Sequence, residues 1–262
     1  MTQRAMASLA NVVAHLDTLL RTSEIPDYPP AFNGLQLENR GEVTRVAAAV
    51  DFSLRTVEAT IAAHADLLIV HHGMFWGGTQ PIRGRRYQQV AMLLQNDIAV
   101  YSAHLPLDAH PTLGNNVLLA RALELTPAGG FARYQTIDIG VRGECDLPTT
   151  TLVERAQAIA AKHGGTVVAT PHARHRRTRR FGICTGAGAS SDTIREALAS
   201  GIDTLIVGEG PHHTGVEAAD ADLVIIYAGH YATETFGVQA LAGHLEREYA
   251  LPWSFLDLPT GL

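Results

Sequence analysis

Two adjacent histidines, His71 and His72, follow an apolar run that ends at Val70. The run 66–70 is typical of a short buried strand, and open α/β sheets bind their ligands at the carboxyl ends of such strands. Neighbouring strand residues point to opposite faces of a sheet, so one ion cannot easily take both imidazoles unless the backbone bends at Gly73. The pair predicts either such a bend or a site with two ions. The structural alternative is a strand end whose rings are hydrogen-bonded to backbone.

A second group of potential ligands lies where the chain leaves the next predicted strand. His104, Asp108 and His110 follow one another there at spacings of four and two residues. A mixture of imidazole and carboxylate is favoured by Zn, Mn, Fe, Co and Ni. Histidine and aspartate are also ordinary loop residues, so this segment alone does not establish a metal site.

Two further polar clusters follow strands in the second half of the chain. His230 and Glu234 open a predicted helix, and residues four apart share a helix face, so both can converge on one point. The alternative is an ordinary helix N-terminus with an acidic first turn. Glu209 lies in Gly-Glu-Gly-Pro-His-His, residues 208–213. That segment suits a group near the substrate, or only a helix start at Pro211.

Taken together, the clusters predict five metal ligands at one sheet edge. A single catalytic metal with an open position usually has three protein ligands. Five suit two ions that share a bridging carboxylate, roughly 3.5–4 Å apart. His104 and Glu209 are the candidate catalytic groups, since either could move protons near such a centre. The predicted metal ligands are His71, His72, Asp108, His230 and Glu234.

Apolar runs alternate with helical patterns along the whole chain, which predicts α/β architecture with mixed sheets covered by helices. The expected elements of the first half are strand 43–52, helix 54–65, strand 66–71, helix 85–96, strand 98–105 and helix 115–125. Those of the second half are strand 135–145, helix 152–163, strands 166–170 and 180–185 paired around a basic turn, helix 192–200 capped by Ser191 or Asp192, strands 205–208 and 223–228, helix 232–249 and edge strand 253–258.

The two halves are similar in plan. Asp-x-Leu-Ile-Val followed by polar residues occurs at 66–72 and again at 203–209, and the segment 126–130 has the composition of a linker. We therefore predict two linked, similarly organised α/β domains. The first comprises 1–126 plus 231–262 and carries most metal ligands, and the second comprises 127–230.

Composition excludes several classes of protein. Of 262 residues 46% are apolar, too many for a disordered chain, yet no run is long enough to span a membrane. The net charge of −6 disfavours non-specific binding of nucleic acid. Two distant cysteines and the lack of a signal sequence predict a reducing, cytoplasmic location. The basic stretch 172–180 is either a phosphate or nucleic-acid site or a solvated turn.

Four motifs in this order resemble the NIF3-like family, whose members are also named GTP cyclohydrolase 1 type 2 homologues. They are His-His-Gly-Met-Phe-Trp, Ser-Ala-His-Leu-Pro-Leu-Asp, Gly-Glu-Gly-Pro-His-His and Gly-His-Tyr-Ala-Thr-Glu. The resemblance implies the short form of the family, with two α/β domains, a dinuclear metal centre and a toroidal homo-hexamer. Two positions depart from the family pattern: Phe32, where an acidic residue usually precedes the asparagine, and Met74, where a small residue or proline usually follows His-His-Gly.

The resemblance also implies roles for individual residues. His72 and Asp108 would hold one ion and His71 and His230 the other, while Glu234 bridges them. His104 would be a nearby base, a partner of a ligand or an extra ligand. The ions would be two divalent metals among Zn, Fe, Mn, Co and Ni.

Two functions from different classes follow from these expectations. The first is a metal-dependent hydrolase that acts on a nucleotide or related small molecule, similar to GTP cyclohydrolase type 2. The second is a metal-stabilised hexameric scaffold or regulatory interaction protein without significant catalysis. Turnover that is lost on substitution of Glu234 while the assembly persists discriminates the first from the second.

Overall fold

The computed structural model describes residues 6–262 and divides into two compact units. The first reaches to Leu107 and includes Gly237–Leu258, while the second comprises Asp108–Phe236 and Pro259–Leu262. The sequence-based boundary lay instead in the segment 126–130. Residues between Asp108 and that segment belong with the second unit because Leu119 and Ala120 pack into its core. Within the described residues, no helix combines the length and apolar character needed to cross a membrane.

A five-stranded sheet forms the centre of the first unit, in the order β13-β4-β5-β6-β2. Only β2 runs antiparallel to its neighbour, so the sheet is mixed. The elements are β1 Ala7–Ser8, α1 Leu9–Leu20, the 3-10 turn Pro29–Ala31, β2 Gly34–Leu37, β3 Glu42–Val43, β4 Val46–Asp51, α2 Leu54–Ala62, β5 Leu67–His72, α3 Arg85–Gln95, β6 Ala99–Ser102 and β13 Trp253–Phe255.

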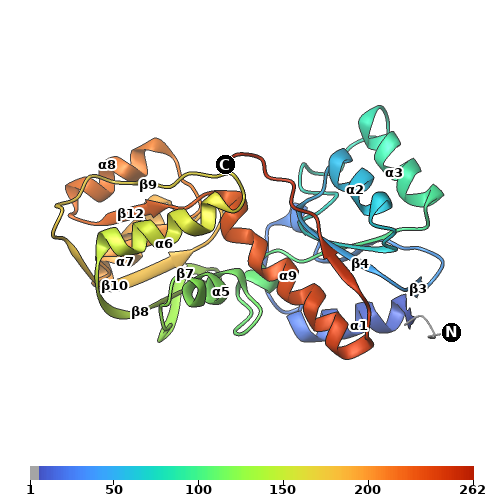
Figure 1. Cartoon of the computed structure of the whole chain (residues 1–262), viewed down its shortest axis with the longest axis horizontal. Helices are drawn as coiled ribbons and strands as arrows, with labels where there is room; N and C mark the ends of the chain where they lie inside the picture. The colour runs from blue at the N-terminus through green and yellow to red at the C-terminus, as the bar shows by residue number, and fades with distance from the viewer. Residues whose placement is uncertain (1–5) are drawn as a thin grey trace. The chain divides into compact units, whose positions relative to one another are not determined.

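Helices cover both faces of this sheet (Figure 1). Val57 of α2 and Leu93 of α3 pack with Leu68 and Val70 of β5 in one apolar cluster. On the other side α1 is tied to the sheet by a 2.8 Å hydrogen bond from the Tyr101 hydroxyl to Asp17. All six residues of β5 are buried, as expected of a central parallel strand. The sheet therefore delivers both β5 histidines into the protein interior.

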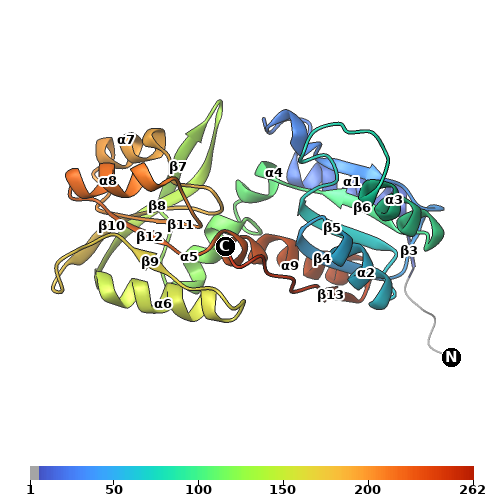
Figure 2. The ribbon, with the colours of Figure 1, turned by 90° about the horizontal axis from the view of Figure 1, so that it is seen from above.

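The second unit is built on a six-stranded sheet in the order β7-β8-β10-β11-β12-β9, in which β10, β11 and β12 are parallel. Figure 2 shows α7 and α8 on one face of this sheet and α6 on the other. The elements are α5 Asn115–Ala122, β7 Gly129–Tyr134, β8 Ile137–Pro148, α6 Thr149–Ala161, β9 Val168–Ala169, β10 Arg177–Cys184, α7 Ser191–Ala199, β11 Thr204–Val207, α8 His212–Asp220 and β12 Val224–Tyr227.

Two helices contain residues of both units. The short helix α4, Leu105–Asp108, ends with the first residue of the second unit. The long helix α9, His230–Tyr249, begins in the second unit and ends in the first. Both units contain mixed sheets with helical layers, which confirms the predicted fold class.

Three details of the prediction were wrong. The strands expected to pair around the basic turn do not pair: β9 is antiparallel to β12, whereas β10 lies between β8 and β11. β10 is buried at its carboxyl end and needs neighbours on both sides, while the two-residue β9 suits an edge. Helix α7 is capped by Ser190, whose hydroxyl accepts from the Thr193 amide at 3.1 Å. The expected linker includes Gly129 and Gly130, which are paired residues of β7.

Candidate metal centre

The first unit brings three buried imidazoles together at the carboxyl end of its parallel strands. His71 and His72 end β5, and His104 follows β6. One nitrogen of each ring lies within 4.8 Å of the other two, and none of the three residues is more than 8% exposed. Such proximity is costly for charged rings and suits neutral rings around a cation. The two strand-end histidines and the predicted catalytic histidine therefore form one group.

Oxygen acceptors orient the two β5 rings. His71 Nδ1 lies 2.8 Å from the Ala103 carbonyl oxygen, and His72 Nδ1 lies 2.8 Å from Asp51 Oδ1. A carbonyl or carboxylate oxygen only accepts, so each Nδ1 carries the proton and donates it. The lone pair of each neutral ring is then on Nε2. This arrangement of an oriented imidazole is typical of metal-binding histidines.

His104 is oriented by a residue that the sequence analysis did not identify. Its Nδ1 donates to Asp27 Oδ1 at 2.8 Å, and its backbone amide donates to Asn33 Oδ1 at 2.7 Å. Burial by itself would raise the pKa of the Asp27 carboxyl. The hydrogen bond from His104, with further hydrogen bonds from Asn33 and Tyr28, outweighs burial and holds that pKa below its usual value. Asp27 is therefore an ionised anchor for the ring.

The second unit places an imidazole between two carboxylates at the start of α9. His230 Nδ1 lies 2.7 Å from Glu209 Oε1, and His230 Nε2 lies 3.1 Å from Glu234 Oε2. Burial lowers the pKa of His230, but the two carboxylates overcome it and raise the pKa to about 9. Without a cation the ring therefore keeps its proton at neutral pH, and a metal at Nε2 would have to displace that proton.

The negative charges of Asp108 and Glu234 both influence the thiol of Cys184, the last residue of β10. Asp108 Oδ1 accepts from Asn115 at 2.8 Å, and Glu234 is only 3% exposed. Burial, followed by the charges of Asp108 and Glu234, raises the pKa of the Cys184 thiol far above its usual value. Gly186 has a φ of +62°, and a Cβ there would overlap Glu234 Oε1. The loop after β10 thus needs glycine to admit this carboxylate.

Other histidines from the predicted clusters have different surroundings. His110 Nδ1 accepts from the amide of Leu113 at 3.0 Å and so closes a turn. His212 and His213 are exposed at the start of α8. None of the three belongs to the imidazole group of the first unit or to the carboxylate–imidazole group of the second.

Several residues around the site escaped sequence analysis. Asp51 is the register partner of His72 across β4 and β5. It is a polar residue at the end of a buried strand, so the argument that identified His72 could also have identified Asp51. The ring of Trp76 lies 4.8 Å from that of His72 and 4.5 Å from that of His104. Asp27 and Gly186 lie in loops, and neither was among the predicted metal ligands or catalytic groups.

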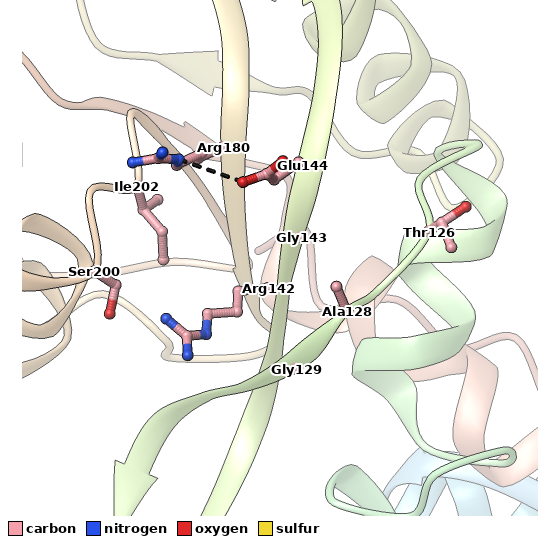
Figure 3. Close-up of a pocket in the computed structure, with 9 residues that line it drawn as sticks. All are labelled: Thr126, Ala128, Gly129, Arg142, Gly143, Glu144, Arg180, Ser200 and Ile202. Atoms are coloured by element: carbon pink, nitrogen blue, oxygen red, sulfur yellow. Dashed lines mark ion pairs between the residues drawn. The ribbon is translucent and has the colours of Figure 1, made fainter.

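Residues 177–180 of the basic stretch lie in the first half of β10, whereas Asp108 and Glu234 act on Cys184 at the other end of that strand. Arg176 and Arg177 pair with Asp222 and Asp146 at 2.5 and 2.6 Å. A cavity of about 540 Å³ next to this stretch is lined by Arg142 and Arg180 (Figure 3). Arg180 Nε lies 3.6 Å from Glu144 Oε1, drawn as a dashed line in the figure. Nearby carboxylates offset much of the positive charge, which favours the solvated turn over a nucleic-acid surface.

The sequence and fold of this chain are similar to those of known proteins. The chain is 42% identical over 257 residues to a Deinococcus radiodurans protein named GTP cyclohydrolase 1 type 2 homolog, with 96% of this chain and 93% of that one covered. It is 41% identical over 251 residues to a Pyrococcus horikoshii protein of the same name, with 96% and 98% covered.

Solved structures agree over nearly the whole chain. A structural-genomics structure of the protein ybgI, described as of unknown function, superposes with a TM-score of 0.86 at 33% identity and covers 98% of this chain and 100% of its own. A protein from Thermus thermophilus superposes with a TM-score of 0.82 at 35% identity and the same coverage. A family model matches residues 7–259. The chain therefore belongs to the Duf34/NIF3 (NGG1p interacting factor 3) family.

Proposed function

We propose that the chain binds two divalent metal ions and uses them to hydrolyse a nucleotide or a related small molecule. The observation that carries the proposal is the hydrogen-bond pattern that four imidazoles share. His71, His72, His104 and His230 each have Nδ1 at 2.7–2.8 Å from an oxygen acceptor. The neutral rings of His71, His72 and His230 would then present Nε2 to the ions, and His104 would offer its Nε2 for proton transfer. Buried carboxylates are available to balance the ionic charge.

The ligands are assigned as the family resemblance implies. His72 and Asp108 would hold one ion, His71 and His230 would hold the other, and Glu234 would bridge them. Asp108 ends the short helix α4, which begins directly after His104, and Glu234 lies one helix turn after His230 in α9. The donors are nitrogen and oxygen, which suits Zn, Fe, Mn, Co or Ni.

Two such ions would supply a bound water of lowered pKa and would polarise the bond under attack. The protein groups then have separate tasks. Hydrolysis adds the hydroxyl of water to the attacked carbon or phosphorus, and the remaining proton goes to the leaving nitrogen or oxygen. His104, held by the ionised Asp27, would move that proton. Glu209 acts through His230, whose ring it orients. The names of the relatives favour a nucleotide substrate.

The test measures bound metal and turnover together. Purified protein is assayed by elemental analysis and then against nucleotides, phosphoesters and lactones. Glu234→Gln removes the bridging charge and is expected to lower turnover by at least about a hundredfold, as loss of a catalytic electrostatic group does. Glu248→Gln, an exposed position on the same helix, is the matched control and should retain full activity.

Two outcomes would redirect the proposal. If no member of the panel is hydrolysed by metal-replete protein, the hydrolase proposal fails. If metal removal instead breaks the assembly and no activity is ever detected, the metal-stabilised scaffold is the better account. We also propose the homo-hexamer and the cytoplasmic location that the sequence predicts; light scattering of the purified protein tests the hexamer, and fractionation of cells tests the location.

A further inference from the structure

A cavity of about 630 Å³ opens in the second unit between the edge strand β9, strand β12 and helix α8. Volumes of about 300–1,000 Å³ are usual for small-molecule sites. Its walls include Val168, Pro171, Pro211, Val216 and Tyr227. Val168 and Val216 are 63% and 52% exposed, so apolar side chains here face the open cavity.

The polar groups of this cavity are few and well placed. The Tyr227 hydroxyl is hydrogen-bonded to Thr214 Oγ1 at 2.8 Å, and the Thr214 hydroxyl donates to the Pro211 carbonyl oxygen at 2.6 Å. These bonds hold the aromatic ring in one position on the wall. A fixed ring with a proline beside it offers flat apolar surfaces, on which planar ring systems pack well.

Helix α8 contains an unexplained glycine at this cavity. Gly215 lies in the helix interior, where glycine costs about 1 kcal/mol relative to alanine. A Cβ at this position would meet Thr170 Cγ2 and Tyr227 Oη at 3.8 Å, which is ordinary contact. Packing therefore does not require glycine. All three residues line the cavity, so the missing methyl group keeps the cavity wide at the cost of helix stability.

One lining residue connects the cavity to the candidate metal ligands. Glu209 lines it, and Oε1 of the same side chain receives the hydrogen bond from His230 Nδ1 at 2.7 Å. A molecule that fills the cavity and contacts Glu209 is therefore connected to His230 through a single side chain, that of Glu209. The second oxygen of the carboxylate is an acceptor for N–H groups at the edge of a ring.

We propose that this cavity binds the heteroaromatic base of the molecule on which the metal centre acts. This inference rests on the proposed function, because it names the part of the substrate that the second unit recognises. Tyr227 and Pro211 contact the faces of the base, Glu209 accepts from its N–H edge, and Gly215 provides the width. The phosphate-free nucleoside is then sufficient for recognition.

The experiment measures binding of 2-aminopurine riboside by its fluorescence, with guanosine as competitor. Ribose 5-phosphate, which lacks the base, should not compete. Gly215→Ala should bind the nucleoside about tenfold more weakly, since one methyl group in a filled pocket changes affinity by about that factor. Gly215→Leu should abolish binding. Gly243→Ala is the control, because this interior glycine of α9 also has room for a Cβ, with its nearest contact at 3.6 Å.

A second measurement separates loss of the cavity from loss of the fold. Gly215→Ala is expected to raise the thermal midpoint, since it improves helix propensity, while it weakens binding. With a substrate in hand, the same variant should raise KM about tenfold at unchanged kcat. Weaker binding by a more stable protein cannot come from unfolding.

The outcomes distinguish this inference from the proposed function. Nucleoside binding that Gly215→Leu removes supports the cavity even if no panel compound is hydrolysed, in which case only the proposed function fails. If the protein hydrolyses a nucleotide and Gly215→Leu does not change the rate, the inference about the cavity is wrong while the proposed function stands. A variant that alters the oligomeric state in light scattering also overturns it, since this face would then be a contact between copies of the chain.

Discussion

The two units contain the same helix–strand segment but use it differently. Residues 53–70 and 190–207 align without a gap, from a capping serine to the end of a central strand. Ser53 accepts from the Thr56 amide and Ser190 from the Thr193 amide, both at 3.1 Å. The similarity noted from Asp-x-Leu-Ile-Val thus extends over a whole helix and strand with matching hydrogen bonds.

The aspartate before each central strand repeats a second detail. Asp66 Oδ1 accepts from the backbone amides of Thr44 and Arg45 at 2.8 and 3.0 Å. Asp203 Oδ2 accepts from those of Arg179 and Arg180, both at 3.0 Å. In each unit the carboxylate therefore ties the central strand to the preceding parallel strand.

The units diverge at the next residue. Val70 is followed by His71, whose ring is fully buried, whereas the equivalent position after Val207 is Gly208. A Cβ on Gly208 would lie 2.5 Å from the Gly186 oxygen and 2.8 Å from the His230 Cα. The second unit therefore has no space for a strand-end ligand at this position. Its imidazole comes instead from the N-terminus of α9.

The largest effect should come from the position that separates the units. Gly208→Ala forces a side chain against backbone atoms that cannot move aside, so the free energy of unfolding should fall by about 3 kcal/mol or more. Urea unfolding measures it, with Gly243→Ala as a glycine whose Cβ has room. An unchanged midpoint would mean that the second unit could have carried a strand-end ligand after all.

Metal-free protein should reveal the different charge environment of His230. Its folded pKa of about 9 is raised above the unfolded value of about 6.5. The stability it contributes is therefore complete below about pH 6.5 and is lost as pH rises through about 9. At about 1.4 kcal/mol for each pKa unit, the loss approaches about 3 kcal/mol.

Urea unfolding in the presence of chelator between about pH 6 and 10 measures this loss. His230→Gln should flatten the profile in that window. A slope that survives the substitution would assign the titration to another group and remove this difference between the units.

The matched aspartates should give matched, smaller losses. Asp66→Ala and Asp203→Ala each leave two backbone amides without their charged acceptor, and each should lower the free energy of unfolding by about 2 kcal/mol. Glu154→Ala, an exposed position on α6, is the control. If only one of the two variants loses stability, the two aspartates do not contribute equally to the free energy of unfolding, although their hydrogen bonds are alike.

The smallest effect is expected at the helix caps. Ser53→Ala and Ser190→Ala should each cost about 1 kcal/mol, and Ser→Asp at either position should restore most of it, because aspartate also accepts at an N-cap. Thermal unfolding of the four variants makes the comparison. Failure of aspartate to rescue would point to the Ser–Thr side-chain contacts rather than to capping.

The central strands, and the polar residues that follow them, were predictable from the sequence. Buried runs such as that before His71 mark central strands, and polar residues after such runs mark the carboxyl edge of a sheet. His104 and Glu209 do follow β6 and β11, as the sequence predicts. The pairing of strands was less predictable: β9 has only two residues, and no local pattern says that it joins β12. Helix α1 and strand β2 also gave no signal strong enough to be predicted.

The partners of the ligands were the least predictable part. Asp51 follows from the register of two strands once that register is known. Asp27 and His104 lie far apart in sequence and meet because of the loop between α1 and β2. Gly186 is needed because Glu234 comes close to its backbone. The two residues are far apart in sequence, so this requirement becomes visible only in the folded structure.

Cys184 has a consequence for the redox behaviour of the candidate centre. Its thiol is buried beside the carboxylates of Asp108 and Glu234, and its raised pKa keeps it protonated. A buried, protonated thiol reacts slowly with alkylating reagents and with peroxide. We therefore expect the centre to survive oxidants that inactivate enzymes with an exposed, reactive thiolate, although a sulfur atom lies close to two of its candidate ligands.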